Sequence, residues 1–226
     1  MDETGLIFKD SLSGKSFHEK GKGCNGGKRL KERITVSVCS NVIGEKEQLL
    51  VIGMCERPRC FKGIDIASLP VLYRFNKKAW MTSTIFSDWL NRFNRKMKRQ
   101  GRNVLLFLDN APTHPKVDLS NVKLKFFPPN TTSHLQPMDQ GIIQAMKLKY
   151  RKRQLQYLIA QMDRQKRLTG SQLLKHITIL GVIYWVSSAW TDVDSSTITK
   201  CFSKAGFLQP LPAPSTETLR QHPRCC

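Results

Sequence analysis

The stretch from Val104 to Tyr150 reads VLLFLDNAPTHPKVDLSNVKLKFFPPNTTSHLQPMDQGIIQAMKLKY, and it decides the fold. It contains two apolar runs of strand length, Val104–Leu108 and Val122–Phe127, each bounded by turn-forming residues. A helical repeat of apolar residues begins just after Pro137. This order of elements predicts an α/β domain in which both runs form buried strands.

One acidic residue follows the first strand, and another lies at the start of the helix. Asp109 comes directly after the first apolar run, where a parallel strand delivers its last residue to the edge of a sheet. Asp139 lies at the start of the helix, where unpaired N–H groups and the helix dipole favour a carboxylate. Two carboxylates at one edge can bind hard divalent cations such as Mg²⁺ or Mn²⁺. The sequence therefore predicts a metal site there, with Asp2 as the candidate third ligand.

Long motifs in this region carry a family resemblance. LFLDNAPTH and FFPPNTTSHLQPMDQGII resemble the DDE superfamily endonuclease domain of Tigger/pogo transposases and their domesticated relatives, including the Jerky and centromere protein B group. The resemblance covers nearly the whole chain up to Phe207. Its further motifs are MDETGLIFK, LLVIGMCERPRCFKG, NKKAWMTSTIFSDWLNRFNRKM and SSAWTDVDSSTITKCFSKAGF.

The resemblance implies a ribonuclease H-like fold, a mixed sheet flanked by helices, with three acids that hold two metal ions for phosphodiester cleavage and strand transfer. Carried onto this sequence, the catalytic and metal-binding acids are Asp2, Asp109 and Asp139. In the family the first acid ends a central strand, whereas only Met1 precedes Asp2 here. We therefore expect a truncated first strand in a chain that begins at an internal methionine or is a fragment. Asp2 is then either a metal ligand or a solvated terminal acid.

Four polar residues near the two central acids have two interpretations each. Asn110 either orients a metal-bound water or a substrate phosphate, or bonds its own backbone in a turn. His114 is either a proton carrier near neutral pH or a cap of the following segment. His134 and Gln136 lie close to Asp139 in sequence, where they either contact substrate or make structural hydrogen bonds.

The charge of the chain points to a polyanionic partner. Thirty-seven Lys and Arg face seventeen acids, for a net charge of +20. Such an excess favours binding to nucleic acid, because neutralising phosphates releases counterions, although a merely basic soluble protein is an alternative. We expect DNA-backbone contacts in a Gly-rich loop and along one helix, with solvated charges as the alternative. The candidates are Lys28, Arg29, Lys147, Lys149, Arg151, Lys152 and Arg153.

Periodicity outlines the remaining elements. Residues 57–76 contain prolines and glycine and are expected to be irregular. The alternation in Arg33–Val42 is typical of a half-buried strand. We predict a hairpin, four helices and the domain limits 1–168 for the endonuclease-like domain, 169–207 for its helical extension and 208–226 for a disordered tail. The predicted segments are Arg33–Val42 paired with Gln48–Met54, and helices Thr82–Gln100, Gln140–Arg167, Ser171–Trp190 and Asp194–Ala205.

The composition indicates the cellular compartment of the protein but does not decide between two main functions. Seven cysteines without a framework spacing indicate a reduced protein, and no apolar run reaches the length of a membrane span, so we expect a nuclear protein. The chain is either a metal-dependent DNA endonuclease or a domesticated DNA-binding protein that keeps the fold and cuts nothing. A third alternative is an inactive fragment that associates with itself or with a full-length relative.

Overall fold

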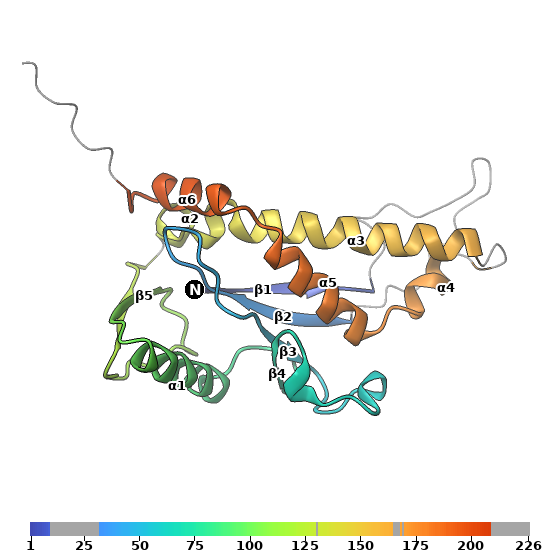
Figure 1. The fold of residues 1–226 in the computed structure, drawn as a ribbon, viewed down its shortest axis with the longest axis horizontal. Helices are drawn as coiled ribbons and strands as arrows, with labels where there is room; N and C mark the ends of the chain where they lie inside the picture. Colours follow the sequence, from blue (N-terminus) through green and yellow to red (C-terminus); the bar gives the residue numbers. More distant parts are fainter. Residues whose placement is uncertain (10–31, 130, 165–167, 169, 209–226) are drawn as a thin grey trace, which may run out of the picture.

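The structure is a computed structural model, shown in Figure 1, and it describes residues 1–9, 32–129, 131–164, 168 and 170–208. The predicted DNA contacts Lys28 and Arg29 lie outside this part of the chain, as does the predicted tail beyond Leu208.

A four-stranded sheet forms the centre of the molecule, in the order β1-β2-β3-β4. β1 (Asp2–Ile7), β2 (Arg33–Val38) and β3 (Leu50–Gly53) are antiparallel neighbours, and β4 (Leu72–Phe75) runs parallel to β3. The predicted hairpin of β2 and β3 is confirmed. β4 lies in the stretch expected to be irregular, where short 3-10 turns at Arg59–Phe61 and Ile66–Ser68 precede it. That expectation is therefore wrong for β4.

The strand that carries Asp2 is formed. β1 pairs with β2 along its whole length, from Asp2 opposite Val38 to Ile7 opposite Arg33. The strand begins at Asp2, and the six residues from Asp2 to Ile7 are all paired. Asp2 is the first residue of β1 rather than its last, and the pairing with β2 holds it in place.

The two strands predicted within the stretch Val104–Tyr150 form a parallel pair beside this sheet. β5 (Val104–Leu108) pairs with β6 (Val122–Phe126) in register, which confirms both strands. The prediction that both are buried is wrong in part, because Leu106 and Leu108 are buried but Leu105 is exposed, and Val122 is the one buried residue of β6. The amino group of Met1 donates a hydrogen bond to the carbonyl oxygen of Phe107 at 3.2 Å. The start of β1 therefore lies next to β5.

Helices cover both faces of the four-stranded sheet, and Figure 1 shows α3, α5 and α6 on one side and α1 on the other. The bounds are Ser83–Arg99 for α1, Thr132–Leu135 for α2, Ile143–Arg164 for α3, Gly170–Lys175 for α4, Ile179–Thr191 for α5 and Ser195–Lys204 for α6. Within the described ranges, no helix is long and apolar enough to cross a membrane.

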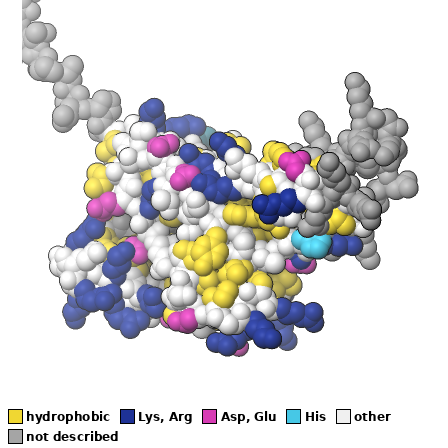
Figure 2. Space-filling view, turned by 45° about the vertical axis from the view of Figure 1, so that its right-hand side comes forward, with side chains coloured by type: hydrophobic (Ala, Val, Ile, Leu, Met, Phe, Trp, Pro, Cys, Tyr) yellow, Lys and Arg dark blue, Asp and Glu magenta, His cyan; other side chains and the backbone are white. Residues whose placement is uncertain are grey.

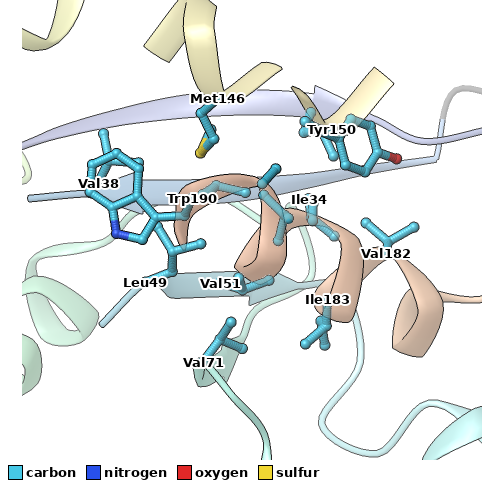
Figure 3. Close-up of a cluster of buried hydrophobic side chains, with 14 of the residues drawn as sticks. Ile34, Val38, Leu49, Val51, Val71, Met146, Tyr150, Val182, Ile183 and Trp190 are labelled. Carbon is cyan, nitrogen blue, oxygen red and sulfur yellow. The ribbon is translucent and has the colours of Figure 1, made fainter. Parts of the chain in front are cut away.

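Each covered face has its own hydrophobic core. Figure 3 shows Met146 and Tyr150 of α3 and Trp190 of α5 packed over the side of β2 that carries Ile34 and Val38. The opposite core includes Leu50 and Ile52 of β3 with Phe86, Trp89 and Leu90 of α1. β2 was predicted to be half-buried, but its residues from Ile34 to Val38 are all buried, because helices pack on both sides of it.

The helix boundaries follow local capping chemistry. The Thr82 hydroxyl accepts a hydrogen bond from the amide of Ile85, and Gly101 follows the helix with φ +64°, which confirms the predicted limits of α1. The helix predicted for Ser171–Trp190 is two helices. Thr178 interrupts it, because its hydroxyl accepts from the amide of Gly181 and so caps a new helix, α5.

Candidate metal and nucleic-acid site

The three candidate acids come from three separate elements. Asp2 opens β1, Asp109 directly follows β5, and Asp139 lies in a π-helical turn, Met138–Ile142, that precedes α3. Met1 contacts Phe107, and Glu3 is linked to Asp109 through His114. β1 and β5 therefore run in the same direction. Asp2, at the start of β1, and Asp109, directly after β5, are therefore connected through the residues on either side of Asp2.

Asp2 is a buried carboxyl group with another carboxylate nearby. Its exposed fraction is 8%, and burial, followed by the charges of Asp139 and Glu3, raises the pKa of Asp2 to about 8. A hydrogen bond from the amide of Glu3 to Asp2 Oδ1, 2.7 Å long, opposes this rise. Without a compensating cation, Asp2 is therefore largely protonated at neutral pH.

Asp109 is tied to a buried histidine. His114 Nδ1 lies 2.7 Å from Asp109 Oδ1, and His114 Nε2 lies 3.3 Å from Glu3 Oε1. The hydrogen bond from His114 lowers the pKa of Asp109 despite its partial burial. Burial disfavours a charged His114, but the hydrogen bonds to both carboxylates outweigh it and raise the pKa of His114 to about 10.

His114 is therefore an imidazolium that bridges β1 and the end of β5 at neutral pH. The role of His114 as a proton carrier stays a prediction. Phe86 of α1 packs against the imidazole with ring centroids 4.4 Å apart. Sequence reasoning did not single out Glu3, because its link to His114 joins positions 111 residues apart.

The other polar candidates make local contacts. The side-chain amide of Asn110 donates to the carbonyl oxygen of Phe127, so it joins the ends of β5 and β6. The carbonyl oxygen of His134 accepts a hydrogen bond from the side chain of Gln140. Gln136 is 2% exposed and faces a cavity. For Asn110 the structure thus favours the structural alternative.

One side of α3 extends the site. Asp139, Lys147 and Arg151 line a surface hollow of about 270 Å³. Burial and the charge of Arg151 lower the pKa of Lys147, while Asp2 and Asp139 act to raise it. Lys147 is therefore a positive charge within electrostatic reach of two candidate acids.

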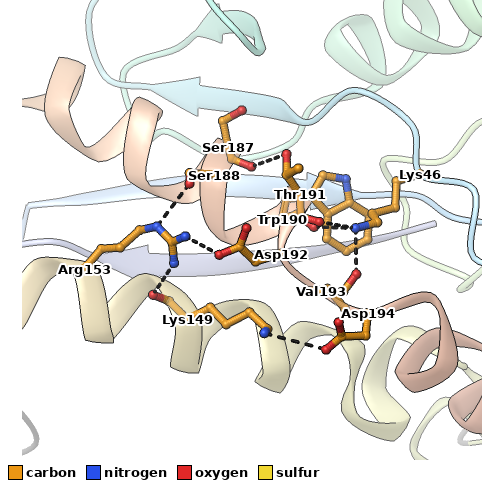
Figure 4. A network of polar contacts seen from close by, with 10 residues as sticks. All are labelled: Lys46, Lys149, Arg153, Ser187, Ser188, Trp190, Thr191, Asp192, Val193 and Asp194. Carbon is orange, nitrogen blue, oxygen red and sulfur yellow. Dashed lines mark hydrogen bonds and ion pairs between the residues drawn. The ribbon is translucent and has the colours of Figure 1, made fainter.

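Another side of α3 is used for internal contacts. Figure 4 shows Arg153 bonded to Asp192 and Ser188, and Lys149 paired with Asp194 at 3.8 Å. These bonds join α3 to α5 and to the residues that precede α6. The predicted basic band is thus divided: Lys147 and Arg151 lie beside Asp139, Lys149 and Arg153 hold helices together, and Lys152 is exposed.

The three candidate acids suit a divalent cation in their chemistry but not in their arrangement. In the described part of the chain, no group of three or more His, Cys, Asp or Glu side chains is arranged closely enough to hold a metal ion. The donor chemistry nevertheless suits a hard cation, because Asp2 and Asp139 repel each other and a cation between them would relieve that repulsion. The hydrogen bonds to the Asp109 side chain in the described ranges fall on Oδ1, so Oδ2 is the oxygen left for a ligand.

A mixed sheet between two layers of helices agrees with the predicted ribonuclease H-like fold. One solved structure with a similar fold is the "Mos1 transposase paired-end complex with left transposon end", with a TM-score of 0.50 and 15% sequence identity. The match covers 90% of this chain and 50% of that chain. At this identity the likeness shows the fold alone.

Residues 31–202 match the DDE superfamily endonuclease family, and the chain belongs to that family. Asp109 and Asp139 lie within the matched residues, whereas Asp2 lies before them.

Named relatives agree with this assignment. The chain is 38% identical to Tigger transposable element-derived protein 4 of Mus musculus over 93% of this chain and 39% of that protein. It is 36% identical to CENP-B homolog protein 2 of Schizosaccharomyces pombe over 97% of this chain and 44% of that protein. It is 32% identical to the human major centromere autoantigen B over 81% of this chain and 30% of that protein. The chain thus spans less than half the length of these relatives.

Proposed function

We propose that this chain is a transposase-derived endonuclease domain that binds DNA and uses divalent cations, Mg²⁺ or Mn²⁺, for phosphodiester cleavage or strand transfer. Two observations on the candidate acids support the proposal. Asp2 interacts electrostatically with Asp139, and Asp109 is linked through His114 to the residue next to Asp2. Membership of a family described as endonucleases supports the reaction class.

The residues of the chain would divide the work as follows. Asp2, Asp109 and Asp139 would hold the cations, and His114 with Glu3 would fix the Asp109 carboxylate. Two bound cations supply activation of water or a 3′-hydroxyl and stabilisation of the leaving oxygen. Lys147 and Arg151 would contact the phosphates of DNA that approaches Asp139, because cationic side chains position the backbone without reading its sequence.

The DNA-binding part of the proposal has separate support. The net charge is +20, and Lys and Arg side chains are spread over several regions of the face shown in Figure 2, with fewer acids among them. The matching transposase structure is titled as a complex with a transposon end, and two relatives are named for centromeres or for their centromere-protein likeness. On these grounds we also propose a nuclear location.

A second candidate is a DNA-binding protein of the same fold that does not cut. The tight His114–Asp109 contact and the absence of a ready metal cluster among the described residues favour it. Association with another copy or with a longer relative is compatible with either candidate. We further propose that residues 1–168 and 169–207 fold as one unit, since Leu173 and Val182 share a core with Ile34 and Val36.

A matched pair of lysines on α3 tests where DNA binds. We expect Lys147→Gln to weaken binding to a short duplex several-fold and to reduce the slope of log affinity against log salt by about 1, as for one lost phosphate contact. Lys149→Gln removes the same charge from the side of α3 that faces Asp194 and should leave both quantities nearly unchanged. Fluorescence anisotropy at several salt concentrations measures them. Equal effects of the two substitutions would reject the Asp139 side of α3 as the binding surface.

A further inference from the structure

Trp80 is a large apolar side chain that the fold leaves in solvent. It lies in residues 76–82, which connect β4 to α1, and it is 56% exposed. Trp89 and Trp190 are buried and Trp185 is half-buried, so Trp80 is the most exposed of the four tryptophans. An exposed ring contributes little to a hydrophobic core. The backbone that carries this ring is nonetheless held by an extensive set of contacts.

Asn76 fixes the backbone on both sides of the ring. Its Oδ1 accepts hydrogen bonds from the amides of Lys78 and Trp80, at 3.0 and 3.2 Å. Its side-chain amide donates to the carbonyl oxygen of Trp80. The backbone amide of Asn76 donates in turn to the carbonyl oxygen of Gly53 in β3, at 3.1 Å. Both backbone polar groups of Trp80 are therefore bonded to one residue, and that residue is bonded to the sheet.

Ala79 holds the same loop in a strained conformation. Its φ of +50° is the one positive φ at a non-glycine residue in the described part of the chain, and residues with a Cβ rarely adopt this region. Ala79 is fully buried, and its carbonyl oxygen accepts a hydrogen bond of 2.6 Å from the hydroxyl of Thr35 in β2. Strained backbone persists where surrounding contacts fix it, and such residues cluster at ligand-binding sites.

The guanidinium of Arg33 covers one face of the Trp80 ring. Arg33 Cζ lies 5.3 Å from the ring centroid, a favourable contact between a cation and an aromatic face. The guanidinium is oriented by a hydrogen bond of 3.3 Å from Arg33 Nη2 to Thr35 Oγ1. Because Trp80 is still 56% exposed, the other face of its ring is open to solvent.

This ring lies on the same face of the sheet as the bridge from Glu3 to Asp109. Glu3 and Gly5 are two residues apart in β1, so they share one face of the strand and are about 7 Å apart. Arg33 lies against that face, because a Cβ placed at Gly5 would be 3.2 Å from Arg33 Nη2. One strand of DNA rises about 3.4 Å per base, so a few nucleotides reach from Asp109 to Trp80.

The open face of the ring suits an unpaired nucleobase. Every base has a flat π face that stacks on an aromatic side chain, and nearby cations neutralise the phosphates of the same strand. Lys77 and Lys78 are exposed beside Trp80 and supply such cations. A base inside a duplex is covered by its neighbours, so it reaches a protein side chain only when it is single-stranded or turned out of the helix.

We propose that Trp80 is a stacking platform for an unpaired base of the DNA strand that passes Asp109. Arg33 supports the ring from behind, and Asn76 and Ala79 fix its position before DNA arrives. The inference rests on the proposed function for the presence of DNA at Asp109, and it adds a binding site for a nucleobase a few nucleotides away.

Fluorescence anisotropy with a short single-stranded oligothymidylate, and with a duplex of the same length, tests the proposal in the presence of a chelator. We expect Trp80→Leu to weaken single-strand binding by about five- to 150-fold, as loss of one stacked aromatic does, and to leave duplex binding nearly unchanged. Trp80→Phe keeps a ring and should retain most of the affinity. Tyr184→Leu is the matched control, because Tyr184 is 51% exposed on α5, on the other side of the sheet (Figure 1).

Tryptophan emission gives a second readout. Because the other three tryptophans are less exposed, the oligothymidylate should quench the wild type mainly through Trp80, and this quenching should be lost in Trp80→Leu. Unchanged single-strand affinity of Trp80→Leu, or equal weakening of its single-strand and duplex binding, would overturn the proposal. A blue shift of the Trp80 emission that depends on protein concentration without DNA would assign the ring to a contact between two copies instead.

Failure of the platform is distinguishable from failure of the proposed function. The binding test contains no divalent cation and no cleavage step, so a chain that stacks bases and does not nick DNA keeps the platform and loses the endonuclease. A chain that binds duplex DNA normally, and whose single-strand binding ignores Trp80, loses the platform alone.

Discussion

Replacing Asp109 by Asn is expected to lower Mn²⁺-dependent nicking of supercoiled DNA by at least about a thousandfold, as loss of a member of a cooperating catalytic group does. Asn keeps an oxygen that can accept the hydrogen bond from His114, so the link to Glu3 is retained. The substitution removes the charge that a cation requires. Nicking is measured by the conversion of supercoiled to open-circular plasmid, and DNA affinity is measured in parallel.

Asp118→Asn is the matched control for this experiment. Asp118 is exposed in the connection between β5 and β6, nine residues after Asp109, and has no role in the proposed site. The Asp118 variant should nick as the wild type does, and the Asp109 variant should bind DNA with nearly unchanged affinity. Equal nicking by the wild type and the Asp109 variant would rule out the endonuclease proposal and favour the DNA-binding protein that does not cut.

Replacing Asp2 by Asn is expected to stabilise the metal-free protein above pH 4. The folded-state pKa of Asp2 is raised from 3.8 to about 8, so between these values the native protein holds a proton that the unfolded chain has lost. Stability then falls as the pH rises through this window. Each pKa unit corresponds to about 1.4 kcal/mol, so even half of the shift would cost roughly 3 kcal/mol at pH 8. Asn cannot ionise and avoids this loss.

Urea unfolding in the presence of a chelator, at pH 4, 6 and 8, measures this difference. The Asp2→Asn advantage should be near zero at pH 4 and largest at pH 8. His114 contributes a fall in stability of the same sign between its ordinary pKa of 6.5 and about 10, but this contribution is present in both proteins and cancels. A variant that is less stable than the wild type at pH 8 would contradict the burial and repulsion described for Asp2.

The elements that local sequence determines were predictable. The apolar runs of β5 and β6 and the amphipathic pattern of α1 needed no tertiary information, and their limits agree with the structure to within a residue or two. β4 was not predictable in this way, because its four residues follow a proline-rich stretch and pair with β3 across an intervening loop. The break before α5 depends on a single threonine cap within an otherwise helical pattern.

The candidate site also has one part that local sequence predicts and another that depends on tertiary structure. Asp109 and Asp139 were identified from their positions after a strand and before a helix, which are local properties. The bridge from Glu3 through His114 to Asp109 requires two strands to be adjacent, and no local pattern reveals that. The division of the basic residues on α3 depends equally on tertiary partners, since Asp192 and Asp194 lie about forty residues along the chain from Arg153 and Lys149.

We propose that Asp2, Asp109 and Asp139 together bind divalent cations. The measurement that tests it most directly is the thermal midpoint of the purified chain during a Mn²⁺ titration, compared with the Asp139→Asn variant. At one hundred times its dissociation constant, a bound ion stabilises the native state by about 2.7 kcal/mol, which raises the midpoint of a protein of this size by several degrees. We expect this rise for the wild type and its loss in the variant. No rise in the wild type, or an equal rise in both proteins, would contradict it.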